Sequence, residues 1–375
     1  MLTGPLALLR HPWTAAAMLA ALALCAVAIE NLAFTDALMG TTYHRAQAVW
    51  LVIGLCSAGV VAAVDPVYVR RLASVGYLAL VVLLALVLVV GREINYSRRW
   101  IEIGPMNLQP SEFMKLSVIL VLADLFDQRR ATAPWRLRDL WRPAVVLAIP
   151  VVLINLEPDL GTSIVVAAIG GSILLYEGVR GRSLALLAVA AVVAVAVAWE
   201  TGAIRSYQKG RAEAWYQAIV EEDDDPKPTA RRTQAEQALW AVGSGQQTGR
   251  SDDQAKNSIL RHLPFVHTDF ALAPFAARFG LFGTLGLFAA YFVVAAWGLR
   301  LADRATDRFD ALLAVGVSAL IFWQFFINAG MVIGLLPVVG ITLPLISYGG
   351  SSVLTVLVGL GFLVNIALRR RTRAG

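Results

Sequence analysis

Two short polar segments, residues 109–115 and 267–270, stand at the start of long apolar runs. The first carries Glu112 and Lys115, and the second carries Asp269. Hydrophobic residues make up 58% of the chain and charged residues only 15%, and the mean hydropathy is +0.66, values that exclude an ordinary soluble protein. Because a charge at membrane depth is costly, these three side chains are candidates for chemistry or transport.

Apolar runs extend through nearly the whole chain and predict an all-α integral membrane protein with a single polytopic domain, residues 1–375. We expect about ten transmembrane helices. Some runs are shorter than the roughly twenty residues that a bilayer requires, so neighbouring helices must shield them. The runs are 13–29, 46–64, 75–90, 113–125, 144–154, 160–176, 184–199, 270–297, 311–331 and 351–368.

The distribution of basic residues predicts the orientation of the chain. They gather in every second loop, which favours both termini in the cytoplasm and an even number of spans. The net charge of +6 therefore reflects loops that flank the membrane, and we expect no nucleic acid as a partner. The basic segments are 70–71, 129–142, 180–182, 300–308 and 369–373.

The same count places residues 200–268 outside, as one large extracellular loop. Its middle, residues 221–228, is acidic and contains two prolines, a composition typical of a solvated linker. Helices are expected on either side of this linker, at 214–219 and 234–242.

The first polar segment predicts the start of a helix and a place for an anion. Pro110 suits a first helical turn, and Ser111 is able to cap it. Glu112 and Lys115 share one face of that turn, where an ammonium and the helix dipole together attract a phosphate. Arg99, just upstream, could add a planar fork for the same anion. The alternative is a simple ion pair, with Lys115 extended toward the membrane surface.

The second polar segment lies where the large loop returns to the membrane. Asp269 is able to cap the next helix, but Pro274 favours a helix that begins near residue 273. Asp269 is then expected on an irregular segment that lines an enclosed cavity, where a carboxylate is able to act as a base.

Two further segments contain features that break helices. Residues 157–162 predict a tight outer turn in which Asp159 caps the following helix. Residues 336–352 combine high hydrophobicity with two prolines and several glycines, which predicts a re-entrant loop before the last helix.

These motifs resemble those of the SEDS family, which includes RodA, FtsW and SpoVE. The resemblance extends from residue 99 to residue 368, and its strength lies in six motifs that occur in the family's order and spacing. They are Arg99-Trp100-Ile101, the Gln109–Lys115 segment, Pro158-Asp159-Leu160-Gly161-Thr162, His267-Thr268-Asp269-Phe270, Asn328-Ala329-Gly330-Met331 and Leu343-Pro344-Leu345-Ile346-Ser347-Tyr348-Gly349-Gly350-Ser351.

The resemblance implies a multi-pass enzyme of the bacterial cytoplasmic (inner) membrane that polymerises lipid II into peptidoglycan glycan strands on the outer face. Asp269 would be the general base in an inverting glycosyl transfer. Lys115, with Arg99 nearby, would stabilise the leaving undecaprenyl pyrophosphate. A RodA-like role in cell elongation and shape is favoured over an FtsW-like role in division.

The resemblance also assigns supporting roles and partners. Glu112 would orient Lys115, while Asp159 and the loop that contains Ser347 and Gly349 would shape the cavity. The implied partner is a class B penicillin-binding protein, a transpeptidase, and the implied substrates are lipid II and the undecaprenyl-pyrophosphate-linked glycan. We expect no metal held by the protein itself, which leaves open that Mg²⁺ or Mn²⁺ enters with the substrate pyrophosphate.

The chain departs from the family pattern in acidic residues near Asp269. Phe265-Val266 and Ala277-Arg278 stand where family members usually carry acids, and residues 243–247 also differ. Two alternatives therefore stay open: a flippase or transporter of lipid-linked precursors, and a non-catalytic scaffold of a cell-wall synthase. Broken apolar segments with charges inside the membrane are typical of transporters as well.

Overall fold

The structure is a computed structural model, and it describes residues 11–94, 97–104, 106–128, 135–202, 206–220, 234–256 and 259–374. The acidic stretch at 221–228 lies outside the described residues, as do Arg129 and Arg130 of an expected inner loop.

The described chain is mainly helical. Its helices are α1 (Pro12–Met39), α2 (Tyr43–Ala63), α3 (Pro66–Val90), α4 (Pro110–Gln128), α5 (Trp141–Leu156), α6 (Leu160–Tyr176), α7 (Gly181–Glu200), α8 (Ser206–Val220), α9 (Gln234–Ser244), α10 (Asp252–Lys256), α11 (Leu272–Asp303), α12 (Arg308–Val332) and α13 (Gly350–Ala374), with short 3₁₀ turns at Leu137–Asp139 and Ile259–His262.

Each apolar run expected to span the membrane falls largely on one helix of α1–α7 or α11–α13. Among the described residues, seven helices are long and apolar enough to cross a membrane, and α5 and α6 are shorter apolar helices. The all-α membrane fold is thereby confirmed. The count of about ten crossings stays a prediction, because α4 also carries charged residues along its length.

Aspartate caps explain where several helices begin. The side chains of Asp65, Asp159 and Asp307 accept hydrogen bonds from backbone N–H groups in the first turns of α3, α6 and α12. Asp159 therefore plays the capping role that the sequence predicted for it. Ser111 differs from its prediction, because it lies inside α4 and its hydroxyl accepts a bond from the Gln109 amide at 3.0 Å.

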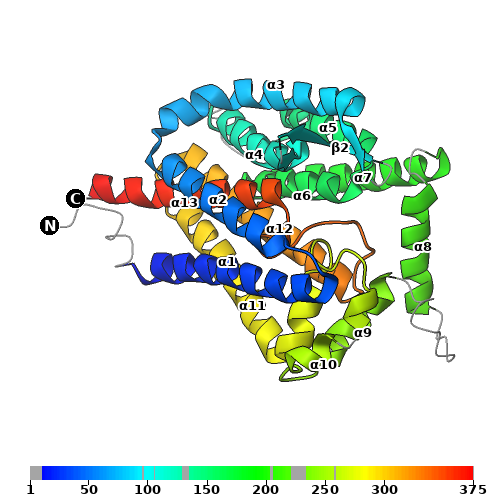
Figure 1. Ribbon diagram of the computed structural model, residues 1–375. Coiled ribbons are helices and arrows are strands. Elements are labelled where there is room, and N and C mark those ends of the chain that lie inside the picture. The colour runs from blue at the N-terminus through cyan, green and yellow to red at the C-terminus, as the bar shows by residue number, and fades with distance from the viewer. Residues whose placement is uncertain are drawn as a thin grey trace.

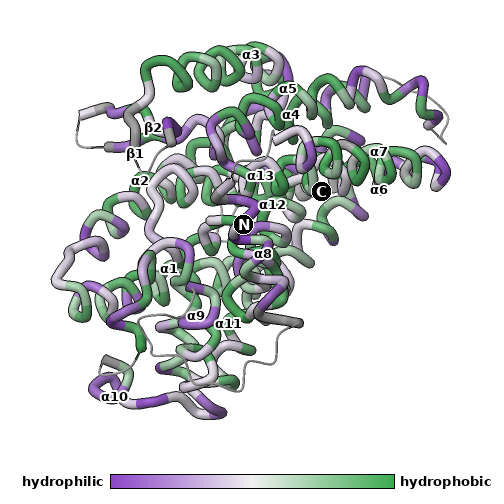
Figure 2. The backbone as a smooth tube through the Cα atoms, turned by 90° about the vertical axis from the view of Figure 1, so that its right-hand side faces the viewer, coloured by the Kyte–Doolittle hydropathy of each residue, from purple (hydrophilic) through white to green (hydrophobic). Residues whose placement is uncertain are grey.

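The helices form a bundle whose two ends differ. The start of α1 and the end of α13 lie at one end, and α8 stands across the opposite end (Figure 1). In Figure 2, α3 is hydrophobic along most of its length, whereas α10 is mainly hydrophilic. Among the candidate spanning helices, α12 is the most buried. Of its apolar 18-residue stretch, 83% is buried inside the protein, against 7% for the corresponding stretch of α7. The core therefore centres on α12.

A three-stranded antiparallel sheet lies between α3 and α4, and the sequence did not predict it. Its strands are β1 (Arg92–Ile94), β2 (Ser97–Ile103) and β3 (Met106–Leu108), in the order β1-β2-β3. The register pairs Arg92 with Trp100 and Ile101 with Leu108. This sheet carries Arg99 to the start of α4.

Helix α11 is broken at Gly280, whose φ of 63° and ψ of −164° are not helical. The N–H groups of Leu281 and Phe282 donate to the Gln246 and Gln247 carbonyls at 2.8 and 3.1 Å, so the loop after α9 fills the break. A Cβ at residue 280 would lie 2.4 Å from the Gly249 nitrogen, which explains the need for glycine. These contacts fix the orientation of the short first half of α11 relative to its second half.

We predict that Gly361→Ala separates α13 from α2. A methyl group at this position would lie 2.7 Å from the Ala58 carbonyl oxygen and 2.8 Å from its Cα, and backbone atoms cannot yield as side chains do. The expected cost is about 1–3 kcal/mol, measured as a lower thermal unfolding temperature in detergent.

The matched control for this change is Gly59→Ala on α2, where nothing lies within 4 Å of the added methyl group. This variant should unfold at or slightly above the wild-type temperature. Equal unfolding temperatures for Gly361→Ala and wild type would contradict the packing described for α2 and α13.

Candidate functional site

The predicted site residues meet around one cavity of about 940 Å³. Its wall comes from β2, the start of α4, the turn between α5 and α6, α8, the segment before α11 and the irregular segment between α12 and α13. Ser347 lies behind this wall rather than in it. The predicted residues that line the cavity are Arg99, Glu112, Lys115, Asp159, Asp269 and Gly349.

Lys115 forms a buried ion pair at the floor of the cavity. Its Nζ lies 2.7 Å from Glu112 Oε1, and the side chain is only 2% exposed, so it does not extend to the membrane surface. Glu112 and Lys115 are three residues apart on α4, a spacing that brings their side chains together. The Lys115 ammonium also donates to Gln324 Oε1 at 3.2 Å.

Gln324 connects this ion pair to the last part of the chain, a contact that no pattern in the sequence predicted. Its Nε2 donates to the Thr342 carbonyl at 3.2 Å and to Ser352 Oγ at 2.9 Å. The same side chain thus accepts from Lys115 and donates to the irregular segment before α13. Because both groups of the amide are satisfied, the position of the ammonium is fixed from two sides.

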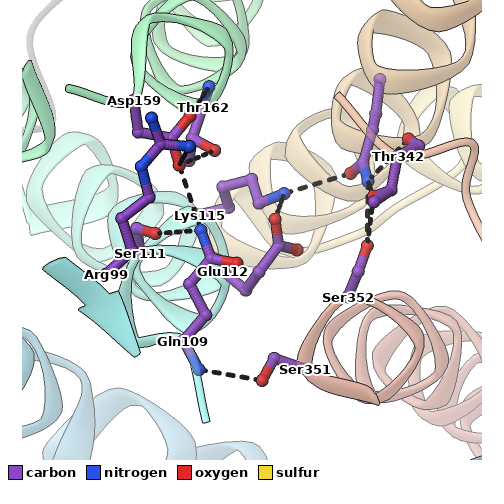
Figure 3. Close-up of polar contacts among 11 residues, drawn as sticks. Arg99, Gln109, Ser111, Glu112, Lys115, Asp159, Thr162, Thr342, Ser351 and Ser352 are labelled. Carbon is purple, nitrogen blue, oxygen red and sulfur yellow. Dashed lines mark hydrogen bonds and ion pairs between the residues drawn. The ribbon is translucent and has the colours of Figure 1, made fainter. Parts of the chain in front are cut away.

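A second polar cluster joins Gln109, just before α4, to the starts of α6 and α13 (Figure 3). The Gln109 Nε2 donates to Asp159 Oδ2 at 3.0 Å, and the Gln109 backbone N–H donates to Ser351 Oγ at 3.0 Å. Asp159 also accepts from the Thr162 N–H at 3.1 Å. These bonds hold the beginnings of α4, α6 and α13 together.

Arg99 supports the turn between α5 and α6. Its guanidinium donates to the carbonyls of Glu157 and Pro158, the first of them at 2.9 Å, and lies 3.8 Å from Asp159 Oδ2. Part of its hydrogen-bonding capacity is therefore used by the protein. The side chain still faces the cavity, which is consistent with a further contact to an anion.

The backbone of the segment that carries Asp269 is held by the irregular segment before α13. Ser347 Oγ donates to the Thr268 carbonyl, and the Tyr348 N–H donates to the His267 carbonyl at 2.8 Å. The same Ser347 hydroxyl accepts from the Leu343 N–H at 2.8 Å. Ser347 thus positions the site from behind the cavity wall.

Two asparagines complete the support of this backbone. Asn328 Nδ2, on α12, donates to the Asp269 carbonyl at 2.8 Å and to the Ile341 carbonyl at 2.6 Å. Asn31 Nδ2, on α1, donates to the Ala271 carbonyl at 2.9 Å. Asn328 belongs to one of the motifs noticed in the sequence, but neither residue could be assigned a role there. Four carbonyls around Asp269 are thus fixed by three separate parts of the chain.

The Asp269 carboxyl is well suited to accept a proton. Burial raises its pKa to about 6, and the positive charge of Arg211, on α8, acts in the opposite direction. A hydrogen bond from Thr268 and the charge of Arg99 also lower this pKa, while Asp159 raises it. A carboxyl with such a pKa is ionised at neutral pH, yet is a better base than an exposed aspartate.

The departure at Arg278 has a structural explanation. Its guanidinium pairs with Glu30 and with Asp252, the latter at 2.9 Å, and lies 4.4 Å from the centre of the Phe34 ring. Arg278 therefore connects the first half of α11 to α1 and α10.

Among the described residues, no group of three histidine, cysteine or acidic side chains could hold a metal ion.

Comparison with known proteins extends these observations. A family model named for FtsW, RodA and SpoVE, described as a cell cycle protein, matches residues 10–372. The peptidoglycan glycosyltransferase MrdB of Escherichia coli (strain K12) is 32% identical over 86% of this chain and 84% of its own. The probable peptidoglycan glycosyltransferase FtsW of Hydrogenovibrio crunogenus is 33% identical over 95% of this chain and 90% of its own.

Solved structures agree with this grouping. A chain of a peptidoglycan synthase complex superposes with a TM-score of 0.77 at 30% identity and covers 95% of this chain and 97% of that one. Rod shape determining protein RodA of Thermus thermophilus gives a TM-score of 0.69 at 28% identity, covering 95% and 96%. The chain therefore belongs to the FtsW/RodA/SpoVE family of multi-pass bacterial membrane proteins, as its motifs predicted.

Proposed function

We propose that this protein is a peptidoglycan glycosyltransferase that joins lipid-linked disaccharide units, with Asp269 as its general base. The observation that carries the proposal is the cavity in which the Asp269 carboxylate shares a wall with the Lys115 ammonium and the Arg99 guanidinium. Base and cations are the two kinds of group that glycosyl transfer from a diphosphate requires.

The chemical step follows from this arrangement. The hydroxyl oxygen of the acceptor sugar attacks the anomeric carbon of the donor, and Asp269 accepts the hydroxyl proton. The bond between the anomeric carbon and the diphosphate oxygen breaks as the new glycosidic bond forms. The leaving undecaprenyl pyrophosphate keeps the electron pair, and attack from the opposite face inverts the anomeric configuration.

The cations act on the leaving group. Developing negative charge on the diphosphate is stabilised by Lys115, which lies in the second turn of α4, close to the positive end of the helix dipole. Before substrate binds, Glu112 balances the ammonium. Mg²⁺ or Mn²⁺ bound to the diphosphate would add to this stabilisation, and the protein itself need not hold the ion.

The proposed setting is the outer face of the cytoplasmic membrane, with lipid II as substrate and both termini in the cytoplasm. Support for this orientation comes from the basic loops of the sequence and from α8, which lies at the end of the bundle opposite the start of α1 (Figure 1). The partner we propose is a class B penicillin-binding protein, because a chain of similar fold is part of a peptidoglycan synthase complex. The RodA-like role in elongation and shape belongs to the same proposal.

We predict that Asp269→Asn loses at least about 100-fold in glycan polymerisation, because an amide of the same shape cannot accept the proton. The measurement is formation of glycan strands from lipid II by the purified protein. Asp252→Asn is the control, since Asp252 pairs with Arg278 and does not line the cavity, so this variant should retain activity.

This assay also separates the rival functions. A flippase or a scaffold makes no glycan even as wild type, and transfer of lipid II across vesicles would then distinguish these two. Wild-type activity in Asp269→Asn would disprove the role assigned to this carboxylate.

We predict an acid limb in the pH dependence of polymerisation, with a midpoint near pH 6. Only the ionised carboxylate accepts a proton, and the pKa of Asp269 is raised to about 6. Activity should therefore be about half-maximal near pH 6, fall further as the pH drops, and level off roughly one pH unit above this value. An acid limb near pH 4, the value for an exposed aspartate, would argue against a buried base.

We predict that Lys115→Met destabilises the protein by about 3–5 kcal/mol, because Glu112 is left as an unpaired charge in the interior. The double variant Glu112→Gln/Lys115→Met should recover most of this stability and stay inactive. Thermal unfolding and polymerisation together measure the two effects. Recovery of activity in the double variant would show that the ion pair serves the fold alone.

A further inference from the structure

Helix α8 lies outside the bundle, yet it reaches the catalytic cavity. Gln208, Arg211 and Ala212 of this helix line the cavity wall. Trp215 Nε1 donates to the Gly334 carbonyl at 3.0 Å, and Arg211 Nη1 donates to the Val338 carbonyl at 3.4 Å. Both carbonyls belong to the irregular segment between α12 and α13, so this segment holds α8 against the cavity.

Arg211 and Asp269 approach each other beside Gly340. A Cβ placed on Gly340 would lie 3.4 Å from Asp269 Oδ2 and 4.0 Å from Arg211 Nη1. The φ of Gly340 is +76°, a backbone conformation that residues with a Cβ rarely adopt. Glycine therefore leaves the space between the carboxylate and the guanidinium open to the cavity.

The other charges that act on Asp269 come from different elements. Arg99 of β2 is a second cation, but it lies within 3.8 Å of Asp159, whose negative charge opposes it. Thr268 is a neutral donor on the same segment as Asp269. His267, two residues before Asp269, stacks its ring on the Tyr43 ring, with 4.5 Å between the two ring centres. Arg211 is thus the cation that acts most strongly on this carboxylate.

We propose that Arg211 is a positioning residue of the glycosyl-transfer site, carried into it by α8, whose guanidinium keeps the Asp269 carboxylate ionised and directed into the cavity. This inference rests on the proposed role of Asp269 as the base. It makes the extramembrane helix α8 a functional part of the site. A site built only from the membrane helices would then lack its main charge partner for the base.

The consequence is a specific change in pH dependence. Removing the guanidinium takes away an interaction that favours the ionised carboxylate, so protonation of Asp269 becomes easier at a given pH. The acid limb of polymerisation must therefore move to higher pH. Activity should recover as the pH rises, because the base itself is still present.

The experiment measures lipid II polymerisation by the full-length protein as a function of pH for wild type, Arg211→Met and Arg211→Lys. For Arg211→Met we expect the acid limb to move up by about one pH unit. Arg211→Lys keeps the charge and should lie between the two.

The matched control is Lys209→Met, which removes the same charge from the same helix. Lys209 contacts the Trp199 carbonyl and ring and does not line the cavity. Its acid limb should stay at the wild-type pH.

An acid limb that does not move in Arg211→Met, with activity lowered equally at every pH, overturns the inference. If Arg211→Met does not fold, Trp215→Phe is the variant that tests the inference. It removes the hydrogen bond from Trp215 to the Gly334 carbonyl, which helps to hold α8, and it keeps Arg211. Its acid limb should shift upward by a smaller amount, and an unchanged limb counts against the proposal. Activity in Asp269→Asn would instead overturn the proposed base, which is a separate result.

Discussion

The irregular backbone between α12 and α13 is the constraint on which the site depends. Without water in the membrane interior, each exposed carbonyl there must find a donor within the protein. Gln47 Nε2 donates to the carbonyls of Leu345 and Ser347, both at 3.0 Å, and the Tyr291 hydroxyl donates to the Pro344 carbonyl. These donors come from α2 and α11, which explains how a non-helical segment stays in place.

The same segment then positions the functional residues on either side of it. Through Ser347 and Tyr348 it holds the backbone beside Asp269, and through Thr342 it contacts Gln324, the partner of Lys115. Through the carbonyls of Gly334 and Val338 it holds α8. One chain segment therefore connects the proposed base, the buried cation and α8. A change in the conformation of this segment would therefore alter the positions of Asp269, Lys115 and α8.

Burial of charge gives the cavity its chemical character. The ion pair of Glu112 and Lys115 is costly to place in the interior, and removing either partner alone leaves the other uncompensated. Burial raises the pKa of Asp269, although the charge of Arg211 and a hydrogen bond from Thr268 act in the opposite direction. The cavity wall thus carries a paired cation, Lys115, and a carboxylate, Asp269, whose raised pKa suits the base proposed above. Glycosyl transfer from a diphosphate uses both.

The sequence by itself determined the helical membrane fold, the capping role of Asp159 and the place of Asp269 on an irregular segment, and it placed Glu112 and Lys115 on one face of a helix. These features depend on hydropathy and on spacing within a few residues, which are local properties of a chain. Only the tertiary structure decided that Arg211, Gln324 and Asn328 belong to the site, and that Ser347 supports it from behind. Their contacts join segments far apart in the chain, and no local pattern records which distant donor will meet a given carbonyl.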